Sequence, residues 1–286
     1  MIRVKIFNGL GNQLFQYACG RAMQEKYKGE LYLDIADFKV NQRKYSLNNY
    51  KLNENIKILQ EDNTFLNFRK NILLKVIYKI FPNIAYKIQS KFGKYLYFGD
   101  TYINIEKNFT NNYYLYGYWQ SEKYFENIKS TIKEELVLKN PLQDDKLNLI
   151  KEIENKNSVA IHIRRGDYLT NKLYKDICNI NYYKEAIEIM KEKVDNPVFY
   201  VFSNEIDWVK ENWEFDANMV FVDVENKDFE ELEMMKHCKH FIIANSSFSW
   251  WAQYLSDNEN KIVIAPQKWY NNNKKTDIYM DNWIKI

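Results

Sequence analysis

Two adjacent arginines, Arg164 and Arg165, have the most specific chemistry in this sequence. They follow the apolar run 159–163, which predicts a buried strand. Charged side chains at the carboxyl end of such a strand lie where open α/β sheets bind ligands. A guanidinium presents a planar fork of N–H donors to a phosphate or a carboxylate. The pair therefore predicts an anion site at this strand end.

Polar segments follow two other predicted strands of the second half. The segment 203–205 (Ser-Asn-Glu) follows the strand 197–202, and the segment 245–247 (Asn-Ser-Ser) follows the strand 241–244. In a parallel sheet these ends share one edge with the arginines. A helix predicted from Ser247 would add free amides and a dipole that favour a phosphate. Taken alone the serines are better explained as an ordinary helix cap, but together with the two arginines they favour an anion site.

A glycine turn, Gly9-Leu-Gly-Asn-Gln13, follows the first predicted strand, 3–7, and opens a helix that runs to about Tyr27. Such a turn can hold an anion against backbone amides, or it can simply allow close packing. A nicotinamide oxidoreductase would need a third glycine, which this turn lacks. Asp34 is the only acidic candidate for the ribose contact of that class.

No metal site is expected from the residue pattern. No Asp-x-Asp pair stands where a divalent cation would bridge a pyrophosphate, and the three cysteines are scattered. His237 and His240 are spaced i, i+3, but they bracket a helix end, where histidines complement the dipole. We therefore expect the arginines to neutralise a bound pyrophosphate in place of Mg²⁺.

The elements that must position these residues alternate regularly in the second half. Strands at 158–163, 197–202, 219–222, 241–244 and 262–265 are separated by helices at 182–194, 205–213, 229–238 and 247–255. This alternation predicts a parallel sheet with helices on both faces. The first half opens with a βαβ unit, and 37–110 is expected to be mostly helical, with a helix at 67–81. We place the domain boundary in the linker at 138–145, giving domains 1–145 and 146–286.

Composition excludes several classes of protein. The chain has 286 residues, 46% of them hydrophobic, and a net charge of +3, which is not the footprint of a nucleic-acid-binding protein. The N-terminus has no apolar stretch of signal-peptide length. The most apolar later segment, 72–81, is shorter than the roughly 20 residues that a membrane crossing needs. A reducing cytoplasm fits the cysteines best.

Four segments together resemble the α-1,2-fucosyltransferases of glycosyltransferase family 11. They are 9–18 (GLGNQLFQYA), 162–168 (HIRRGDY), 202–205 (FSNE) and 238–251 (CKHFIIANSSFSWW). They occur in the family's order and span most of the chain. The segment 35–110 is not covered by any of them.

The resemblance implies an α/β, GT-B-like fold, with two Rossmann-like domains facing a central cleft and the C-terminal one binding GDP-β-L-fucose. It implies inverting transfer of fucose to O2 of a terminal galactose, without cofactor or essential metal. The donor would contact residues of the second half: His162, Arg164, Arg165, Glu231, Asn245, Ser246, Ser247 and Phe248. Glu231, sixteen positions before Ser247, would read the guanine edge. Gly11, Asn12 and Gln13 would face the cleft from the first domain.

The chemistry of fucosyl transfer agrees with this resemblance. The leaving group is a negatively charged GDP, which fixed cations and helix-end amides stabilise. Asp167, Arg165 and Asn12 are the expected catalytic residues. Asp167 is the best candidate for the base that an inverting displacement needs. Its alternative role, which the sequence leaves equally open, is to orient Arg164 or Arg165 through an ion pair.

The residues themselves do not specify the acceptor. Its determinants are expected in the first domain and in the loop 168–180. The chain looks bacterial, which suggests a lipid-linked O-antigen or lipooligosaccharide intermediate at the cytoplasmic membrane face, while free β-galactosides such as lactose would also serve. The linkage rests on the resemblance, so α-1,3 and α-1,6 transfer stay open on chemistry alone. A non-catalytic glycan-binding module is the other class considered, although it would not need the arginine pair and serine cap.

Overall fold

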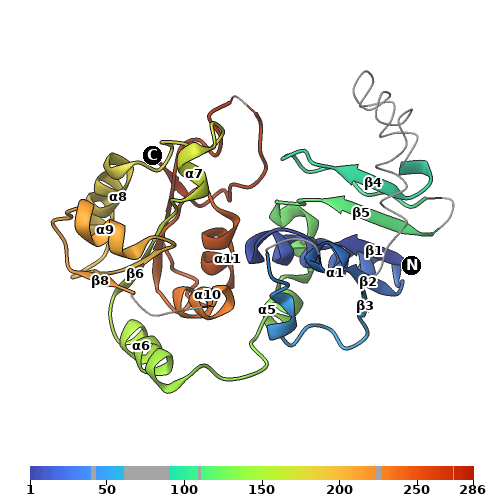
Figure 1. The fold of residues 1–286 in the computed structure, drawn as a ribbon, viewed down its shortest axis with the longest axis horizontal. Coiled ribbons are helices and arrows are strands. Elements are labelled where there is room, and N and C mark those ends of the chain that lie inside the picture. The colour runs from blue at the N-terminus through green and yellow to red at the C-terminus, as the bar shows by residue number, and fades with distance from the viewer. Residues whose placement is uncertain (40–42, 61–89, 109–110, 223–226, 273) are drawn as a thin grey trace. The chain divides into compact units, whose positions relative to one another are not determined.

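The chain forms two compact units in this computed structural model, Met1–Lys139 and Asn140–Ile286. The residues described are 1–39, 43–60, 90–108, 111–222, 227–272 and 274–286. Each unit is built on its own parallel sheet (Figure 1), so the α/β class predicted from the sequence is confirmed. The helix expected at 67–81 and the apolar segment 72–81 lie outside the described residues.

The first unit contains a five-stranded sheet with the order β3-β2-β1-β5-β4, and every pair in it is parallel. The strands are β1 (Ile2–Lys5), β2 (Leu31–Asp34), β3 (Lys57–Leu59), β4 (Lys94–Tyr97) and β5 (Tyr113–Gly117). Helix α1 (Leu10–Tyr27) connects β1 to β2, as the sequence predicts, and α5 (Lys129–Glu135) lies near the end of the unit. The segments that follow β1, β5 and β4 share one edge of this sheet.

Strands β3 and β4 differ from the mostly helical content expected for 37–110, within the part of that range that the structure describes. They are the two outer strands of the sheet, and Lys57 and Ile58 of β3 are exposed. An edge strand with exposed residues carries no clear alternating pattern. Its conformation comes from pairing with β2 or β5, which local propensity does not report.

A buried ion cluster joins β1 to β2. The carboxylate of Asp34, which is 0% exposed, accepts hydrogen bonds from Arg3 Nη2 and Lys5 Nζ, both at 3.0 Å. Lys5 also pairs with Asp37 at 3.0 Å. A buried carboxylate is tolerated because it is paired in this way. Asp34, the one acidic candidate for a nicotinamide ribose, is therefore engaged inside the first unit.

The second unit contains a six-stranded parallel sheet with the order β11-β10-β9-β6-β7-β8. Its strands are β6 (Ser158–Ile163), β7 (Val198–Ser203), β8 (Met219–Phe221), β9 (His240–Ile242), β10 (Val263–Ala265) and β11 (Ile284–Lys285). Its helices are α6 (Asp144–Glu154), α7 (Asp167–Thr170), α8 (Ile180–Lys193), α9 (Ile206–Asn212), α10 (Asp228–Lys236) and α11 (Ser247–Leu255).

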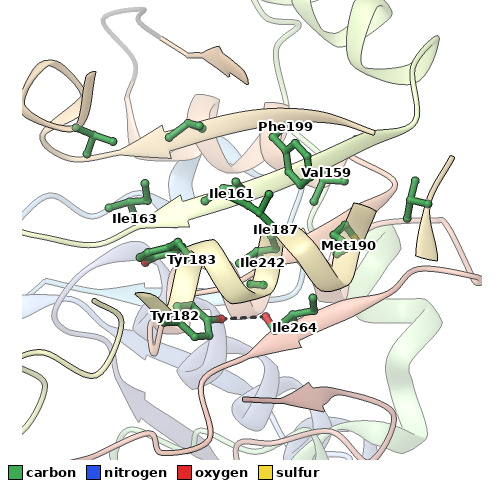
Figure 2. Close-up of a cluster of buried hydrophobic side chains, with 14 residues drawn as sticks. Val159, Ile161, Ile163, Tyr182, Tyr183, Ile187, Met190, Phe199, Ile242 and Ile264 are labelled. Atoms are coloured by element: carbon green, nitrogen blue, oxygen red, sulfur yellow. Dashed lines mark hydrogen bonds between the residues drawn. The ribbon is translucent and has the colours of Figure 1, made fainter. Parts of the chain in front are cut away.

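Helix α8 packs on the central strands of this sheet through a buried apolar cluster. The cluster includes Val159, Ile161, Ile163, Tyr183, Ile187, Met190, Phe199, Ile242 and Ile264 (Figure 2). Tyr182 Oη donates to the carbonyl oxygens of Ile243 at 2.6 Å and Ile264 at 3.2 Å. Each large apolar side chain buried here contributes about 1.5–3 kcal/mol. This packing fixes the strands whose carboxyl ends carry the arginines and serines.

Three details differ from the sequence-based expectation. The last strand is β11, not 262–265, because two residues give too short a pattern to recognise. Helix α6 begins at Asp144, inside the segment 138–145 that was expected to be a linker, since Asp144 and Asp145 complement the positive helix end. The units divide after Lys139, whereas the sequence places the boundary after 145, inside α6.

Candidate functional site

The turn after β6 is shaped by Gly166. Its φ is +61°, a left-handed conformation that side chains disfavour. A Cβ at this position would also lie only 2.9 Å from Asn204 Nδ2, in the segment after β7. Glycine is therefore needed for the chain to turn sharply, directly after Arg164 and Arg165.

Arg165 is held by the neighbouring strand end and helix. Its backbone N–H donates to Asn204 Oδ1 at 3.0 Å, and its Nε donates to Glu205 Oε2 at 2.9 Å. Its guanidinium carbon lies 3.1 Å from the centre of a Trp208 ring. With these contacts the side chain is only 12% exposed. The sequence marked 203–205 as a polar strand end but gave Glu205 and Trp208 no role.

Arg164 is the more open of the two arginines, with its side chain 24% exposed. Its Nη2 donates to Asp167 Oδ1 at 2.7 Å, and its guanidinium carbon lies 5.5 Å from the centre of the Tyr168 ring. Asp167 is itself 56% exposed. This contact matches the orienting role considered for Asp167, with Arg164 as the partner.

Asn245, at the third strand end, forms hydrogen bonds within the protein through both its side chain and its backbone. Its Nδ2 donates to the Trp269 carbonyl at 3.0 Å, and its Oδ1 accepts from Cys178 Sγ at 3.5 Å. Its carbonyl oxygen accepts from Tyr168 Oη at 3.1 Å. Asn245 is 2% exposed. Its side chain therefore fixes the loop and is not free to contact a donor, which corrects its assignment as a ligand-binding side chain.

Ser246 caps helix α11, as the sequence predicts. Its Oγ accepts a hydrogen bond from the Phe248 amide at 3.3 Å. Ser247, the first helical residue, is half-buried beside it. The Phe248 ring lies 5.5 Å, centre to centre, from the imidazole of His162. The N-terminal end of α11 thus lies next to the end of β6, where its dipole favours an anion.

His162 is a buried, neutral group under this edge. Burial, with a smaller contribution from Arg164, lowers its pKa to about 3. Its Nδ1 has no hydrogen-bond partner among the described residues. A neutral imidazole can donate one hydrogen bond and accept another, which suits an uncharged part of a ligand.

Glu231 on α10 belongs to the same electrostatic environment. Burial raises the pKa of its carboxyl to about 7, Arg164 acts in the opposite direction, and Asp228 raises it further. Arg164 is thus among the charges that act on the Glu231 carboxyl, although the two residues lie far apart in the sequence. A carboxylate there can accept paired N–H donors of a base edge.

Gln13, which the resemblance places at the face of the cleft, lies inside the first unit. It is 0% exposed, and its Nε2 donates to the carbonyls of Asn8 and Lys44, each at 2.8 Å. Its Oε1 accepts from the Ser46 amide at 2.9 Å. The hydrogen-bonding groups of this side chain are thus satisfied inside the first unit, so it is not positioned to contact a donor. Helix α1 is buried on most of its surface, so the sequence does not reveal which polar residues point inward.

The glycine turn of the first unit leads directly into helix α1. The left-handed residue is Asn8, with φ +66°, while Gly9 has an extended conformation as the helix cap. Gly11 is buried within the first turn of α1. Asn12 is partly exposed, and its Oδ1 accepts from Gln120 Nε2 at 2.6 Å.

The late histidines have structural contacts. His237 Nδ1 lies 2.7 Å from Glu154 Oε1, and His240 Nδ1 accepts from the Ile262 amide at 3.1 Å. Over the residues that the structure describes, no three His, Cys, Asp or Glu side chains gather as metal ligands.

The second unit therefore brings most of its predicted site residues to one sheet edge. These are His162, Arg164, Arg165, Asp167, Glu231, Ser246, Ser247 and Phe248. Two guanidiniums, a capped helix end, a neutral imidazole and a carboxyl of raised pKa are suited to binding an anionic nucleotide. In an open parallel α/β sheet, this edge is where ligands bind.

Comparison with known proteins specifies the family. A family model described as "Glycosyl transferase family 11" matches residues 1–286, and the chain belongs to this family of glycosyltransferases. The resemblance noted from the four sequence segments is thereby confirmed.

Three relatives with described activities are similar to this chain in sequence. The chain is 31% identical to an alpha-1,2-colitosyltransferase of Escherichia coli, covering 100% of this chain and 99% of the relative. It is 29% identical to the O-antigen biosynthesis glycosyltransferase WbnK of Escherichia coli, covering 97% and 98%. A galactoside alpha-(1,2)-fucosyltransferase 1 of Aotus azarae is 25% identical, over 51% of this chain and 43% of the relative.

The fold is similar to that of the fucosyltransferase NodZ from Bradyrhizobium. The NodZ α-1,6-fucosyltransferase structure soaked with GDP-fucose aligns with a TM-score of 0.53 and 11% identity, over 89% of this chain and 91% of NodZ. In the part of the chain described here, no helix has the length and apolar character to cross a membrane.

Proposed function

We propose that this protein is an inverting α-1,2-fucosyltransferase that moves L-fucose from GDP-β-L-fucose to O2 of a terminal β-galactose. The observation that carries the proposal is the clustering of Arg164, His162 and the capped α11 at one sheet edge of a family 11 chain. A GT-B-like pairing of the two units stays a prediction.

The donor's pyrophosphate would lie between Arg164 and the first turn of α11. Arg164 is the more exposed of the two guanidiniums, so it would contact the phosphates directly, while Arg165 adds positive charge and fixes the turn. As the bond between fucose C1 and the phosphate oxygen breaks, negative charge grows on GDP. Fixed cations and amides that need no reorganisation are the strongest means of stabilising that charge.

The guanine base would be read by Glu231. Its ionised carboxylate can accept hydrogen bonds from the N1–H and N2–H groups of guanine, a donor pair that uracil does not present. Neutral His162 would lie beside the nucleotide. The Asn245 loop would support both by holding the start of α11 in place.

As the bond from O2 to C1 forms, the acceptor hydroxyl releases its proton to solvent, and GDP leaves with the electron pair of the broken bond between C1 and the phosphate oxygen. Because Asp167 contacts Arg164 at 2.7 Å, we assign it the orienting role. No cofactor or metal is proposed, and the arginines would neutralise the pyrophosphate. Asn12 stays a candidate for a contact from the first unit.

Colitosyl transfer is the second candidate, because the relative of that name is 31% identical over the whole chain. Colitose is L-fucose without its 3-hydroxyl, so both donors present the same GDP to the site. Discrimination would depend on hydrogen bonds to that one hydroxyl.

The similarity to WbnK suggests an O-antigen acceptor, and a lipid-linked one would place the enzyme peripherally at the cytoplasmic membrane face. The test is an acceptor screen with GDP-fucose and GDP-colitose, with the linkage read by NMR. We expect a new α-1,2 bond on galactose from GDP-fucose. Transfer from GDP-colitose alone would favour the second candidate, and another linkage or no transfer would overturn the proposal.

A further inference from the structure

Aromatic side chains gather at the carboxyl edge of the first unit's sheet. Phe7 follows β1, Tyr118 follows β5 and Phe98 follows β4, and these three strands are neighbours. The Tyr118 ring lies 5.4 Å from the Phe7 ring and 5.7 Å from the Phe98 ring, centre to centre. Phe98 is 39% exposed, and Tyr118 is half-buried. An aromatic surface is thus open to solvent at this edge.

Two amide side chains complete this edge. Gln120 Nε2 donates to Asn12 Oδ1 at 2.6 Å. This contact leaves Asn12 Nδ2 as a donor and Gln120 Oε1 as an acceptor, neither with a partner among the described residues. Nearby, Asn8 Nδ2 donates to Tyr118 Oη at 3.3 Å, which helps to fix the ring. The edge therefore offers a fixed donor and a fixed acceptor beside its aromatic surface.

The backbone adopts unusual conformations to present these groups. Trp119, between Tyr118 and Gln120, has φ +57°, and Asn8 has φ +66°. A bulky residue is rarely left-handed, and such strain tends to be kept at functional sites. The Trp119 side chain is 1% exposed, so it anchors the segment inward while its two neighbours lie at the edge.

We propose that Phe7, Phe98, Tyr118, Asn12 and Gln120, here called the aromatic–amide edge, form the subsite for the acceptor's terminal galactose. The inference rests on the proposed function and names the part of the chain that selects its acceptor. The apolar C–H face of the sugar would pack on Phe98 and Tyr118, while its hydroxyls would pair with the two amides.

The residue types match a neutral sugar better than the nucleotide. None of the five carries a formal charge, whereas the second unit's edge carries two guanidiniums. An apolar surface with a few fixed polar groups is the usual composition of a small-molecule site. The two edges would thus divide the substrates, with GDP on the cationic one and the galactoside on the uncharged one.

The test compares Phe98→Ala and Gln120→Ala with the wild-type enzyme. Phe92→Ala is the control, since Phe92 is a 60% exposed aromatic of the same unit outside the edge. We expect Phe98→Ala and Gln120→Ala to raise the acceptor KM about tenfold. GDP affinity and donor hydrolysis without acceptor should stay within about twofold, and the control should behave like wild type.

A direct binding measurement separates failure of the subsite from failure of the proposed function. Saturation-transfer NMR with methyl β-galactoside needs no donor, so it decides the question even if GDP-fucose is not a substrate. We expect signals with the wild type and the control that are lost in Phe98→Ala. Unchanged signals, an unchanged acceptor KM, or an equal loss of donor hydrolysis would overturn the subsite.

Discussion

Arg165 and Glu205 are joined by a hydrogen bond of 2.9 Å between Nε and Oε2, across the ends of the adjacent strands β6 and β7. The Glu205 carboxylate and the Trp208 ring together enclose the Arg165 guanidinium. Arg164, one residue earlier, is left as the more open cation. Arg165 is thus held within the turn, and Arg164 is the arginine that we propose meets the anion.

Glu205→Gln tests this division. The substitution keeps the shape of the side chain but removes the charge that holds Arg165. Because the pair is partly exposed, we expect a cost of about 1 kcal/mol, or about fivefold in the Kd for GDP. Isothermal titration calorimetry with GDP measures this Kd. Glu211→Gln, an exposed change on the same helix α9, is the control, and equal affinities in the two variants would contradict the positioning role.

Asp167→Asn separates the two roles considered for this residue. If Asp167 orients Arg164, the variant should lose GDP affinity about threefold to tenfold, and transfer should fall with it. Titration of GDP and the transfer rate decide the matter together. Transfer that falls while GDP affinity is unchanged would instead identify a base. Asp176→Asn, an exposed carboxylate of the following loop, serves as the control.

The pH dependence of GDP binding reports on Glu231, whose pKa burial raises to about 7. The carboxyl must be ionised to accept the guanine N–H groups, so binding below pH 7 requires it to lose a proton. Affinity should therefore weaken as the pH falls, by about tenfold between pH 7.5 and pH 6. His162 stays neutral throughout this range, because its pKa is about 3.

Glu231→Gln should bind GDP more weakly at pH 7.5 and show less pH dependence. The phosphate of GDP itself titrates near pH 6, so the difference between the two proteins is the quantity to read. Parallel curves for the wild type and the variant would contradict the assignment of Glu231 to the base.

Gln13→Ala should affect stability and not donor binding. The change removes three hydrogen bonds of the interior, one from the Ser46 amide and two to the carbonyls of Asn8 and Lys44. We expect the free energy of unfolding to fall by about 2–4 kcal/mol, which calorimetry would detect as a lower Tm. An unchanged Tm with weaker GDP binding would restore Gln13 as a ligand-binding residue.

The anion site at the sheet edge of the second unit could be predicted because the sequence signals that mark it are local. An apolar run that ends in Arg164 and Arg165, and a Ser246 cap before a helix, can each be recognised within a few residues. The parallel arrangement of the strands then brings these ends to one edge without further information.

Contacts that depend on strand register could not be predicted in the same way. Glu205 and Trp208 reach Arg165 only because β6 and β7 pair, some forty residues apart. The inward direction of Gln13 and the enclosed side chain of Asn245 likewise follow from tertiary packing. The outer strand β4, with Phe98 at its end, has no periodic pattern of its own.

Titration of GDP into the wild type and Arg164→Lys tests the central claim most directly. Lysine keeps the charge but loses the fork, so we predict GDP binding that is about tenfold to a hundredfold weaker in the variant. Lys193→Ala, an exposed change at the far end of α8, should bind like wild type, and UDP should bind poorly to all three. If GDP fails to bind the wild type, or binds Arg164→Lys equally well, the cationic edge of the second unit is not the donor site.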